Sequence, residues 1–469
     1  MSVHVDEVWE ALPTGCVSPR ELSVDNPYLE RQAARESNAR SYPRRLPLAL
    51  SKGKGLYVQD TDGRSYIDCL ACAGALALGH NHPVVVEAIN RMLRDGLPFQ
   101  TLDLTTPVKD RFVSTLFDAL PASFADGAKI QFCGPSGADA VEAAIKLVKI
   151  ATGRRTVLAF HGAYHGMTHG TLGLTGHLGP KEALSGLMAD VHFLPFPYDY
   201  RCPFGVGGEK GARLSSAYIE RLLDDPNSGV VEPAAMILEV VQGEGGVIPA
   251  ASGWLQEIRR MTKERGIPLI IDEVQTGLGR TGRLFAFEEA GIVPDVVVLS
   301  KAIGGGLPLS VVVYRPEWDQ WTAGAHAGTF RGNQLAMATG QATIEFIIAE
   351  RIEEHAARMG ERLFGLLRRI QTESRSMGDV RGRGLMLGVE IVDRDVPSDM
   401  PDCHPSAPGL ASKIQHEALR RGLILELGGR HNSVVRFLPP LIVTEEQIDT
   451  IAIIFADAIK AAEQQSEAR

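Results

Sequence analysis

The stretch PDVVVLSKAIGGGLPLS, residues 294–310, places a lysine where lysines are unusual. Its apolar run, Val296–Leu299, predicts a short strand that is covered on both faces. Lys301 comes directly after this run and Ser300, and three glycines follow it. Burying an unpaired ammonium group costs free energy, so Lys301 needs a chemical reason to stand at the end of that strand.

Further apolar runs precede this one, and helical patterns such as PVVVEAINRMLRDG separate them. The runs that we interpret as strands are residues 129–133, 155–160, 190–196, 234–241, 268–274 and 295–300. Alternation of this kind predicts an α/β fold, with a mainly parallel sheet flanked by helices on both faces. Ligands of such sheets bind beyond the carboxyl ends of the strands, so the polar residues after each run are the candidates for function.

The organisation of the chain predicts a large and a small domain. We expect residues 1–83 to form an N-terminal arm and strands of the small domain, residues 84–335 the large domain, and residues 336–469 the rest of a smaller α+β domain. DTDG, residues 60–63, interrupts an alternating pattern and predicts a hairpin.

The composition excludes several classes of protein. The 469 residues carry a net charge of −9, without the basic footprint of a nucleic-acid-binding protein. No apolar stretch is long enough to span a membrane, and no leader pattern opens the chain, so we expect a cytoplasmic protein. The cysteines lack zinc-ligand spacing, and we expect no metal site. They are Cys16, Cys69, Cys72, Cys133, Cys202 and Cys403.

The stretch KIQFCGPSGADAVEAAIKLV, residues 129–148, combines a strand, a tight turn and a helix. The small residues Ser136, Gly137 and Ala138 let the backbone approach a ligand, and the first N–H groups of a helix favour a phosphate. The turn matches neither G-x-G-x-x-G nor a P-loop, and a plain strand-to-helix turn explains it equally well.

Other strand ends carry an aromatic side chain and carboxylates. Tyr164 and His165 follow the run at 155–160, where an aromatic ring can stack on a planar ligand. Glu239 lies near the end of the run at 234–241 and Glu244 follows the run, and a solvated loop carboxylate stays open as an alternative for them. Asp272 and Glu273 are neighbours in a strand and therefore point to opposite faces, so only one of them reaches a given site.

These residue types together match one cofactor. A phosphate cradle, a planar stacking residue, one buried carboxylate and one lysine fit pyridoxal 5′-phosphate (PLP), a planar phosphorylated aldehyde with a basic ring nitrogen. Burial or a neighbouring cation lowers the pKa of a lysine, which can then react with the aldehyde. The carboxylate keeps the ring nitrogen protonated, so that the ring accepts carbanion charge.

The motifs resemble those of the class III (omega-amino-acid) aminotransferases, which are fold-type I PLP-dependent transferases. The resemblance covers the chain beyond about residue 40 and rests on IIDEVQTGLGRTG ahead of LSKAIGGGLPL, with YHG, QGEGG and GTFRGNQLA. It implies a large domain with a seven-stranded sheet, and a small domain built from both ends of the chain.

The resemblance also implies roles for the residues around the cofactor ring. Lys301 would be the lysine bonded to the aldehyde, and Asp272 the partner of the ring nitrogen. Gln275 would lie near the ring hydroxyl, with Tyr164 stacked on the ring and His165 beside it.

For the phosphate, the resemblance implies Ser136 and the backbone N–H groups of Gly137 and Ala138. Thr329 is similar to a threonine that reaches the phosphate from the neighbouring subunit. A homodimer with shared active sites follows from that role, and a tetramer stays open.

Two further residues resemble a substrate switch. Arg436 would bind the α-carboxylate of 2-oxoglutarate as a bidentate fork, and Glu244 would pair with Arg436 when the amine donor is bound. Arg381 and Arg383 also fit the family pattern, and we interpret both as structural.

Within the class, the chain resembles the 2,4-diaminobutyrate–2-oxoglutarate 4-aminotransferases in three stretches, ESNARSYPR, FQTLDLTTPVKDRF and FCGPSGADAVEAAIKLVK. Its N-terminal arm is similar to the arms of those enzymes that serve siderophore synthesis. Expected products are aspartate 4-semialdehyde and glutamate. Ornithine, 4-aminobutyrate and acetylornithine stay open as donors. An aminomutase or epimerase, and a non-catalytic PLP-binding module, are further alternatives.

Overall fold

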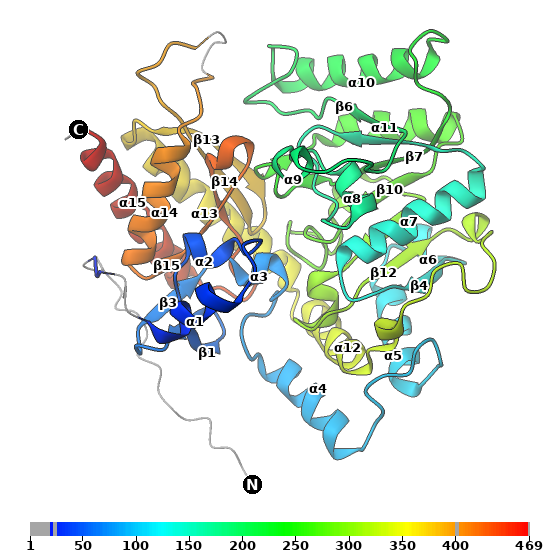
Figure 1. Ribbon diagram of the computed structural model, residues 1–469, viewed down its shortest axis with the longest axis horizontal. Helices are drawn as coiled ribbons and strands as arrows, with labels where there is room; N and C mark the ends of the chain where they lie inside the picture. Colours follow the sequence, from blue (N-terminus) through cyan, green and yellow to red (C-terminus); the bar gives the residue numbers. More distant parts are fainter. Residues whose placement is uncertain (1–18, 22–25, 399–402, 468–469) are drawn as a thin grey trace.

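The computed structural model describes residues 19–21, 26–398 and 403–467 (Figure 1). Residues 1–18 and 22–25 of the predicted N-terminal arm, with Cys16 among them, lie outside the described residues. The large sheet occupies one half of the molecule, and the elements from the two ends of the chain occupy the other half (Figure 1).

The large sheet has seven strands in the order β4-β12-β11-β10-β7-β5-β6. β12 runs antiparallel to both of its neighbours, and the other paired strands are parallel. This confirms the predicted α/β class and its mainly parallel seven-stranded sheet. The strands are β4 (Lys129–Phe132), β5 (Thr156–Phe160), β6 (Val191–Leu194), β7 (Pro233–Leu238), β10 (Leu269–Asp272), β11 (Val296–Leu299) and β12 (Val311–Tyr314).

The sequence pattern located six of these strands and missed β12. The missed strand follows β11 after only a short 3-10 turn, η2 (Lys301–Gly304), and a loop. Because no helix separates the two strands, alternation of strands and helices does not reveal β12.

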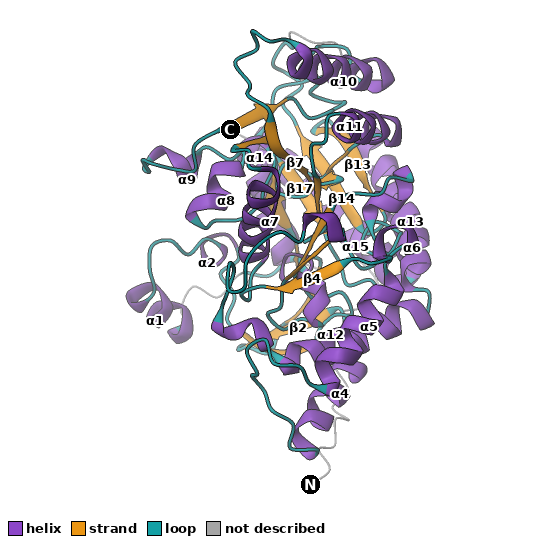
Figure 2. Cartoon of the chain, turned by 90° about the vertical axis from the view of Figure 1, so that its right-hand side faces the viewer, coloured by secondary structure: helices purple, strands orange, loops and turns teal. Residues whose placement is uncertain are grey.

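Both faces of the sheet are covered, which explains the uninterrupted apolar runs. Val296 and Val298 of β11 pack with helix α7 (Gly137–Thr152) in one hydrophobic cluster, and Val297 and Leu299 belong to the larger cluster on the other face. Figure 2 shows α7 and α8 on one side of the strands, and α5 and α6 on the other. The larger cluster is covered by α4 (Pro83–Arg94), α5 (Pro107–Ala119), α6 (Ala122–Ala125), α10 (Gly208–Asp224), α11 (Ser252–Glu264) and α12 (Gln334–Ala349).

The small domain combines both ends of the chain. β3 (Ser65–Asp68) pairs in parallel with β15 (Leu423–Ile424), which lies far along the sequence. β2 (Tyr57–Asp60) pairs antiparallel with β3, which confirms the hairpin predicted at DTDG. The sheets are completed by β1 (Leu50–Lys54), and by β13 (Met377–Arg383), β14 (Met386–Ile391), β16 (Glu426–Gly428) and β17 (Val434–Phe437).

Helices of the small domain and short connecting elements complete the described chain. The helices are α1 (Pro27–Arg35), α2 (Tyr42–Arg45), α13 (Ile352–Glu373), α14 (Pro408–Arg420) and α15 (Glu445–Glu467). The short elements are α3 (Ala71–Gly74), α8 (His169–Leu174), α9 (Gly179–Glu182), β8 (Val241–Gln242), β9 (Ile248–Pro249), η1 (Ala286–Ala290), η3 (Pro316–Trp318), η4 (Thr329–Gly332) and η5 (Arg430–Asn432).

The domain limits stay a prediction. All seven strands of the large sheet fall within residues 84–335, but α12 lies almost wholly beyond residue 335 and packs against α4, α5 and η2. In the described part of the chain, none of the helices has the length and apolarity needed to cross a bilayer.

Candidate active site

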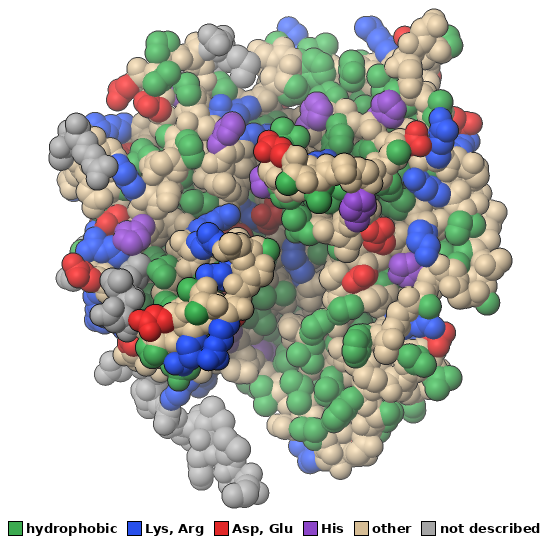
Figure 3. Space-filling model, viewed as in Figure 1, with side chains coloured by type: hydrophobic (Ala, Val, Ile, Leu, Met, Phe, Trp, Pro, Cys, Tyr) green, Lys and Arg blue, Asp and Glu red, His purple; other side chains and the backbone are tan. Residues whose placement is uncertain are grey.

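A cavity of about 460 Å³ opens at the carboxyl ends of the central strands. Figure 3 shows a hollow near the middle of the molecule, with acidic and basic side chains inside it. Most of the predicted site residues line this cavity. They are Ser136, Gly137, Ala138, Tyr164, His165, Glu244, Asp272, Gln275 and Lys301. A second cavity of about 590 Å³ includes Ile267 and Asp295, at the opposite ends of β10 and β11, and none of these residues.

Lys301 begins the turn η2, directly after β11 and Ser300. Its φ of +51° lies in the left-handed region, a conformation that costs a non-glycine residue roughly 1–2 kcal/mol. Its Nζ atom has no hydrogen bond or ion pair with any described residue. Burial lowers the pKa of Lys301, Glu244 opposes this change, and Arg436 adds to it. The side chain is therefore an amine held at the cavity without a fixed partner.

Asp272, the last residue of β10, is buried beside His165. Its Oδ2 atom lies 2.8 Å from Nδ1 of His165, and its Oδ1 accepts a hydrogen bond from the backbone N–H of Val274 at 3.0 Å. Nε2 of His165 is buried and has no hydrogen-bond partner among the described residues. A buried nitrogen of this kind fits a cavity that receives a polar ligand.

Asp272 and Glu273 lie on opposite faces, as the alternation predicts. The carboxylate of Glu273 points away from the cavity, where it accepts hydrogen bonds from the hydroxyl of Thr276 and the backbone N–H of Phe287. Burial raises the pKa of Glu273 to about 7. Only Asp272 is therefore available to the site.

Glu239 also belongs to the site, although we predicted no role for it from the sequence. Its carboxylate is buried and accepts hydrogen bonds from the backbone N–H groups of Tyr164 and Gly243, both at 2.9 Å. Burial raises the pKa of Glu239 to about 7, with His165 opposing and Asp272 adding to this change. Glu239 therefore fixes the segment that carries Tyr164. Its position just after β7, the strand next to β10, is the signal that could have revealed it.

The turn before α7 is packed closely enough to cradle a ligand. Ser136 and Asp139 form a capping box, so the helix begins at Gly137. A Cβ atom on Gly137 would lie 3.0 Å from Cγ1 of Val274, and one on Gly166 would lie 2.5 Å from Cβ of Ala138. The first N–H groups of a helix have no intrahelical acceptor, and here they border the cavity. This end of the cavity fits a phosphate group.

The ion pair that the resemblance implies between Glu244 and Arg436 is present. Nη1 of Arg436 lies 2.6 Å from Oε1 of Glu244 and 3.2 Å from Oε2 of Glu426, and Nη2 donates to Oε1 of Gln275 at 2.8 Å. Burial works against ionisation of Glu244, but Arg436 and Lys301 hold its pKa below the usual range. Arg436 is therefore a buried cation with acidic and amide partners beside the lysine.

Glu426 and Tyr42 are neighbours of this ion pair that the sequence did not reveal. The hydroxyl of Tyr42 donates to Oε1 of Glu426 at 2.7 Å. Burial raises the pKa of Glu426, as does Glu244. Helix α2 of the N-terminal segment is thus tied to the wall of the site.

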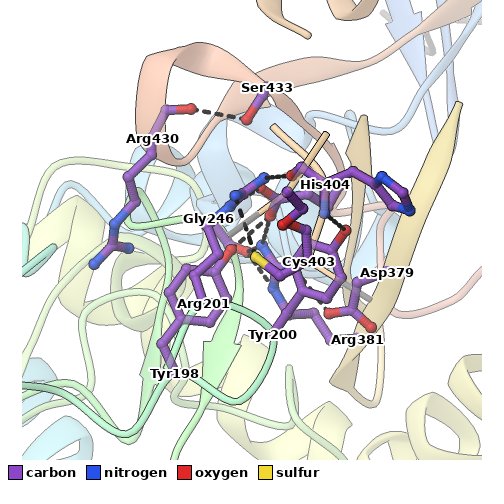
Figure 4. Close-up of polar contacts among 12 residues, drawn as sticks. Tyr198, Tyr200, Arg201, Gly246, Asp379, Arg381, Cys403, His404, Arg430 and Ser433 are labelled. Atoms are coloured by element: carbon purple, nitrogen blue, oxygen red, sulfur yellow. Dashed lines mark hydrogen bonds and ion pairs between the residues drawn. The ribbon is translucent and has the colours of Figure 1, made fainter. Parts of the chain in front are cut away.

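Arginines of the small domain hold the loop that carries Glu244. Nε of Arg381 donates to the carbonyl of Gly246 at 2.9 Å, and Nη1 of Arg430 donates to the carbonyl of Gly245 at 2.9 Å. Both guanidinium groups also lie over the ring of Tyr198, and Figure 4 shows Arg381, Tyr198 and Gly246 in one polar cluster. These contacts agree with a structural role for Arg381.

Thr329 does not line this cavity. It lies at the start of η4 and is exposed, next to Phe330, whose exposed fraction is 59%. The residues around the cavity include no group of three or more metal-binding side chains, and none was found elsewhere among the described residues.

Comparison with known proteins identifies relatives along almost the whole chain. Residues 38–459 match the family described as aminotransferase class-III. A Rhizobium meliloti (strain 1021) protein named diaminobutyrate–2-oxoglutarate aminotransferase is 59% identical over 436 residues, covering 92% of each chain. A Haemophilus influenzae protein of the same name is 49% identical over 438 residues, covering 93% of this chain and 96% of that protein.

Solved structures agree with this relationship. An omega-transaminase from Thermomicrobium roseum superposes with a TM-score of 0.82 at 28% identity, covering 93% of this chain and 98% of that one. An amine transaminase from an uncultivated Pseudomonas species, solved in its PLP-bound form, superposes with a TM-score of 0.81 at 27% identity. The match covers 95% of this chain and 100% of that one. With its fold, its lysine-centred cavity and a family match over most of its length, the chain belongs to the class III aminotransferases.

Proposed function

We propose that the protein transfers the 4-amino group of L-2,4-diaminobutyrate to 2-oxoglutarate, giving L-aspartate 4-semialdehyde and L-glutamate, with PLP as cofactor. The observation that carries this proposal is the 59% identity, over 92% of the chain, to a protein named for this reaction. The reaction is reversible, and metabolite levels set its direction.

The described residues fit PLP. The start of α7 would hold the phosphate, Asp272 the ring nitrogen, Tyr164 the ring face and Lys301 the aldehyde carbon, with His165 and Gln275 at the ring edge. When bound, PLP supplies an aldehyde that condenses with amines and a ring that accepts carbanion charge. Asp272, whose Oδ2 lies 2.8 Å from Nδ1 of His165, would place its carboxylate against the ring nitrogen and favour the protonated ring.

Lys301 moves the proton. Its lowered pKa makes the neutral amine more available near neutral pH, so Lys301 can accept a proton from C4 of diaminobutyrate as a general base. As a general acid, the same nitrogen would then give the proton to the carbon that PLP supplies as its aldehyde. The absence of a fixed partner among the described residues leaves Nζ free to swing between these positions.

Arg436 and Glu244 distinguish the two substrates. 2-Oxoglutarate carries a carboxylate on its reacting carbon, and a bidentate fork from Arg436 would bind it once Glu244 moves away. Diaminobutyrate has no carboxylate on C4, so Glu244 can stay paired with Arg436 at 2.6 Å while the donor reacts. One site therefore accepts both substrates in turn.

The test is an activity panel on the purified holoenzyme. Glutamate formation from 2-oxoglutarate is measured with diaminobutyrate, ornithine, 4-aminobutyrate and acetylornithine as donors. We expect diaminobutyrate to give the highest kcat/KM. Brisk turnover of another donor with little turnover of diaminobutyrate contradicts the proposal. Consumption of diaminobutyrate without any keto acid indicates an aminomutase or epimerase instead.

We also propose a homodimer with shared active sites. Thr329 does not line its own cavity. Its segment is bonded to residues 99–104, and the two segments expose apolar side chains, including Phe99, Leu102, Leu104 and Phe330. Such a patch is typical of a protein–protein interface. Light scattering coupled to size exclusion measures the assembly, and it separates a monomer, a dimer and a tetramer. A monomeric, fully active enzyme contradicts shared sites. A cytoplasmic location and a supply of diaminobutyrate to siderophore synthesis complete the proposal.

A further inference from the structure

Arg436 is a buried cation that has to exchange one of its partners during the proposed reaction. Its side chain is fully buried, and its guanidinium group contacts Glu244 and Gln275, two residues that line the cavity. The proposed function requires Glu244 to leave when 2-oxoglutarate binds. Because a buried charge that loses a partner is costly, another group has to hold Arg436 in place during the exchange.

Glu426 shares Nη1 of Arg436 with Glu244, but the two carboxylates differ in exposure. Oε2 of Glu426 lies 3.2 Å from Nη1, and Oε1 of Glu244 lies 2.6 Å from the same atom. The side chain of Glu244 is 35% exposed and lines the cavity. The side chain of Glu426 is 5% exposed and is absent from the cavity lining. An incoming carboxylate can therefore displace Glu244 and leave Glu426 in place.

The backbone fixes Glu426 opposite Arg436. The two residues are direct partners in the antiparallel pairing of β16 with β17, and Cβ atoms of such partners lie about 4.5–5.5 Å apart. The hydroxyl of Tyr42 donates to Oε1 of Glu426 at 2.7 Å, so both oxygens of this carboxylate have a polar partner. Glu244 sits on a loop instead, and Arg436 is the sole hydrogen-bond partner of its carboxylate among the described residues. Glu244 is thus the movable partner, and Glu426 is the fixed one.

The fixed contacts of Arg436 also limit how Glu244 can bind it. Nη1 is shared with Glu426, and Nη2 donates to Oε1 of Gln275 at 2.8 Å. The stem of Arg436 passes close to Gly428, where a Cβ atom would lie 2.7 Å from Cδ of Arg436. Glu244 is bonded through one oxygen, a contact that a bidentate carboxylate can replace. Loss of Glu426 would free a second N–H group of Nη1 for Glu244, and the exchange would become harder.

The charge of Glu426 responds to the position of Glu244. Burial raises the pKa of Glu426, Arg436 opposes this change, and Glu244 adds to it. When Glu244 moves away, its contribution disappears, so Glu426 ionises more readily. The buried guanidinium group therefore keeps an anionic partner during the exchange, in agreement with the contacts.

Building on the proposed function, we propose that Glu426 is a positioning residue for the acceptor half of the reaction, because it holds Arg436 in place while 2-oxoglutarate replaces Glu244. Glu426 acts through Arg436 and not through contact with a substrate. Tyr42 supports it, so helix α2 contributes to acceptor binding through two successive hydrogen bonds. The donor half keeps Glu244 paired with Arg436 and should depend little on Glu426.

The test measures the two half-reactions separately, in single-turnover experiments on the holoenzyme. In Glu426→Ala we expect kcat/KM for 2-oxoglutarate to fall about tenfold, mainly through KM, because a buried charge-assisted hydrogen bond is lost. The half-reaction with diaminobutyrate should stay close to that of the wild type. Glu426→Gln keeps an oxygen that can accept from Nη1, so it should recover most of the loss.

Glu417→Gln is the matched control. Glu417 is a buried carboxylate of α14 that pairs with Arg420 and Arg421 instead of Arg436. Both half-reactions of this variant should resemble those of the wild type. A loss confined to the Glu426 variants is therefore specific to the contact with Arg436.

Calorimetric binding of 2-oxoglutarate to the PLP form of the enzyme adds a readout without turnover, because this form has no amino group to transfer. The Kd should rise about tenfold in Glu426→Ala and stay near the wild-type value in Glu417→Gln.

Three outcomes overturn the proposal: equal losses in both half-reactions, an unchanged or faster half-reaction with 2-oxoglutarate, and a Glu426→Gln variant that loses as much as Glu426→Ala. If the wild-type enzyme does not use diaminobutyrate, the proposed donor is wrong. The donor half is then measured with the amine that the enzyme uses, and the 2-oxoglutarate half-reaction still tests Glu426.

Discussion

Oε1 of Glu244 lies 2.6 Å from Nη1 of Arg436, and this ion pair joins the large domain to the small domain at the candidate active site. Glu244 sits on a loop between β8 and β9, and Arg436 lies within β17. A backbone hydrogen bond also fixes the loop of Glu244, since the N–H of Gly429 donates to the carbonyl of Glu244 at 2.9 Å. The two domains must therefore keep their arrangement for this pair to form.

Glu244→Gln tests the switch. The substitution removes the charge that competes with substrate for Arg436, so we expect α-carboxylates to bind more readily. In single-turnover experiments, kcat/KM for glutamate should rise, so that the preference for diaminobutyrate over glutamate falls by about tenfold, the effect of a 1.4 kcal/mol change. An unchanged preference contradicts the switch.

Lys301→Ala removes the group that accepts the proton. We expect transamination to fall by at least about 10³-fold, since proton transfer by a positioned side chain contributes roughly 10²–10⁴-fold and covalent capture is lost as well. PLP should still bind through the phosphate cradle, which fluorescence titration measures. Borohydride reduction of the wild-type holoenzyme followed by mass spectrometry should tag Lys301, and a tag on another lysine contradicts its role.

Glu273 predicts a pH-dependent stability effect away from the cavity. Its pKa of about 7 lies above the ordinary value of 4.5, so the folded protein binds more protons than the unfolded chain between these values, and this group costs stability as the pH rises through that window. As the pH rises from 4.5 to 7, the free energy of unfolding of Glu273→Gln should therefore increase relative to that of the wild type by up to about 3 kcal/mol.

Urea unfolding at several pH values measures this gain. The substitution Glu350→Gln, at an exposed position, is the control, and its stability relative to wild type should change little over the same window. A constant difference between Glu273→Gln and wild type across the window contradicts the prediction.

Arg381→Met tests the support of the Glu244 loop. Nη2 of Arg381 lies 2.8 Å from Oε2 of the fully buried Glu390. The substitution therefore removes one of the cations that pair with this carboxylate. It also removes the hydrogen bond that Arg381 donates to the carbonyl of Gly246. We expect a loss of about 3 kcal/mol in the free energy of unfolding, measured by urea titration. Arg201 also contacts Glu390, and the double substitution with Glu390→Leu should recover part of the loss. If Arg381→Met unfolds at the same urea concentration as the wild type, the structural role of Arg381 is contradicted.

The sequence alone determined the fold class, the position of the lysine and the hairpin at residues 60–63. These features are local: an apolar run covered on both faces, a turn, and a polar residue at the end of each strand. The sequence also placed Asp272 and Lys301 at the carboxyl end of the same sheet. It did not reveal β12, because no helix separates that strand from β11.

Only the tertiary structure decided which distant groups share the site. The sequence left open whether Glu239 is solvated, and the structure buries it, with the backbone N–H groups of Tyr164 and Gly243 as its hydrogen-bond donors. The hydroxyl of Tyr42 donates to Glu426, although almost the whole chain separates the two residues. Periodicity reports which face of an element is covered, but a contact between remote segments depends on how the two domains pack, and no local pattern contains that information.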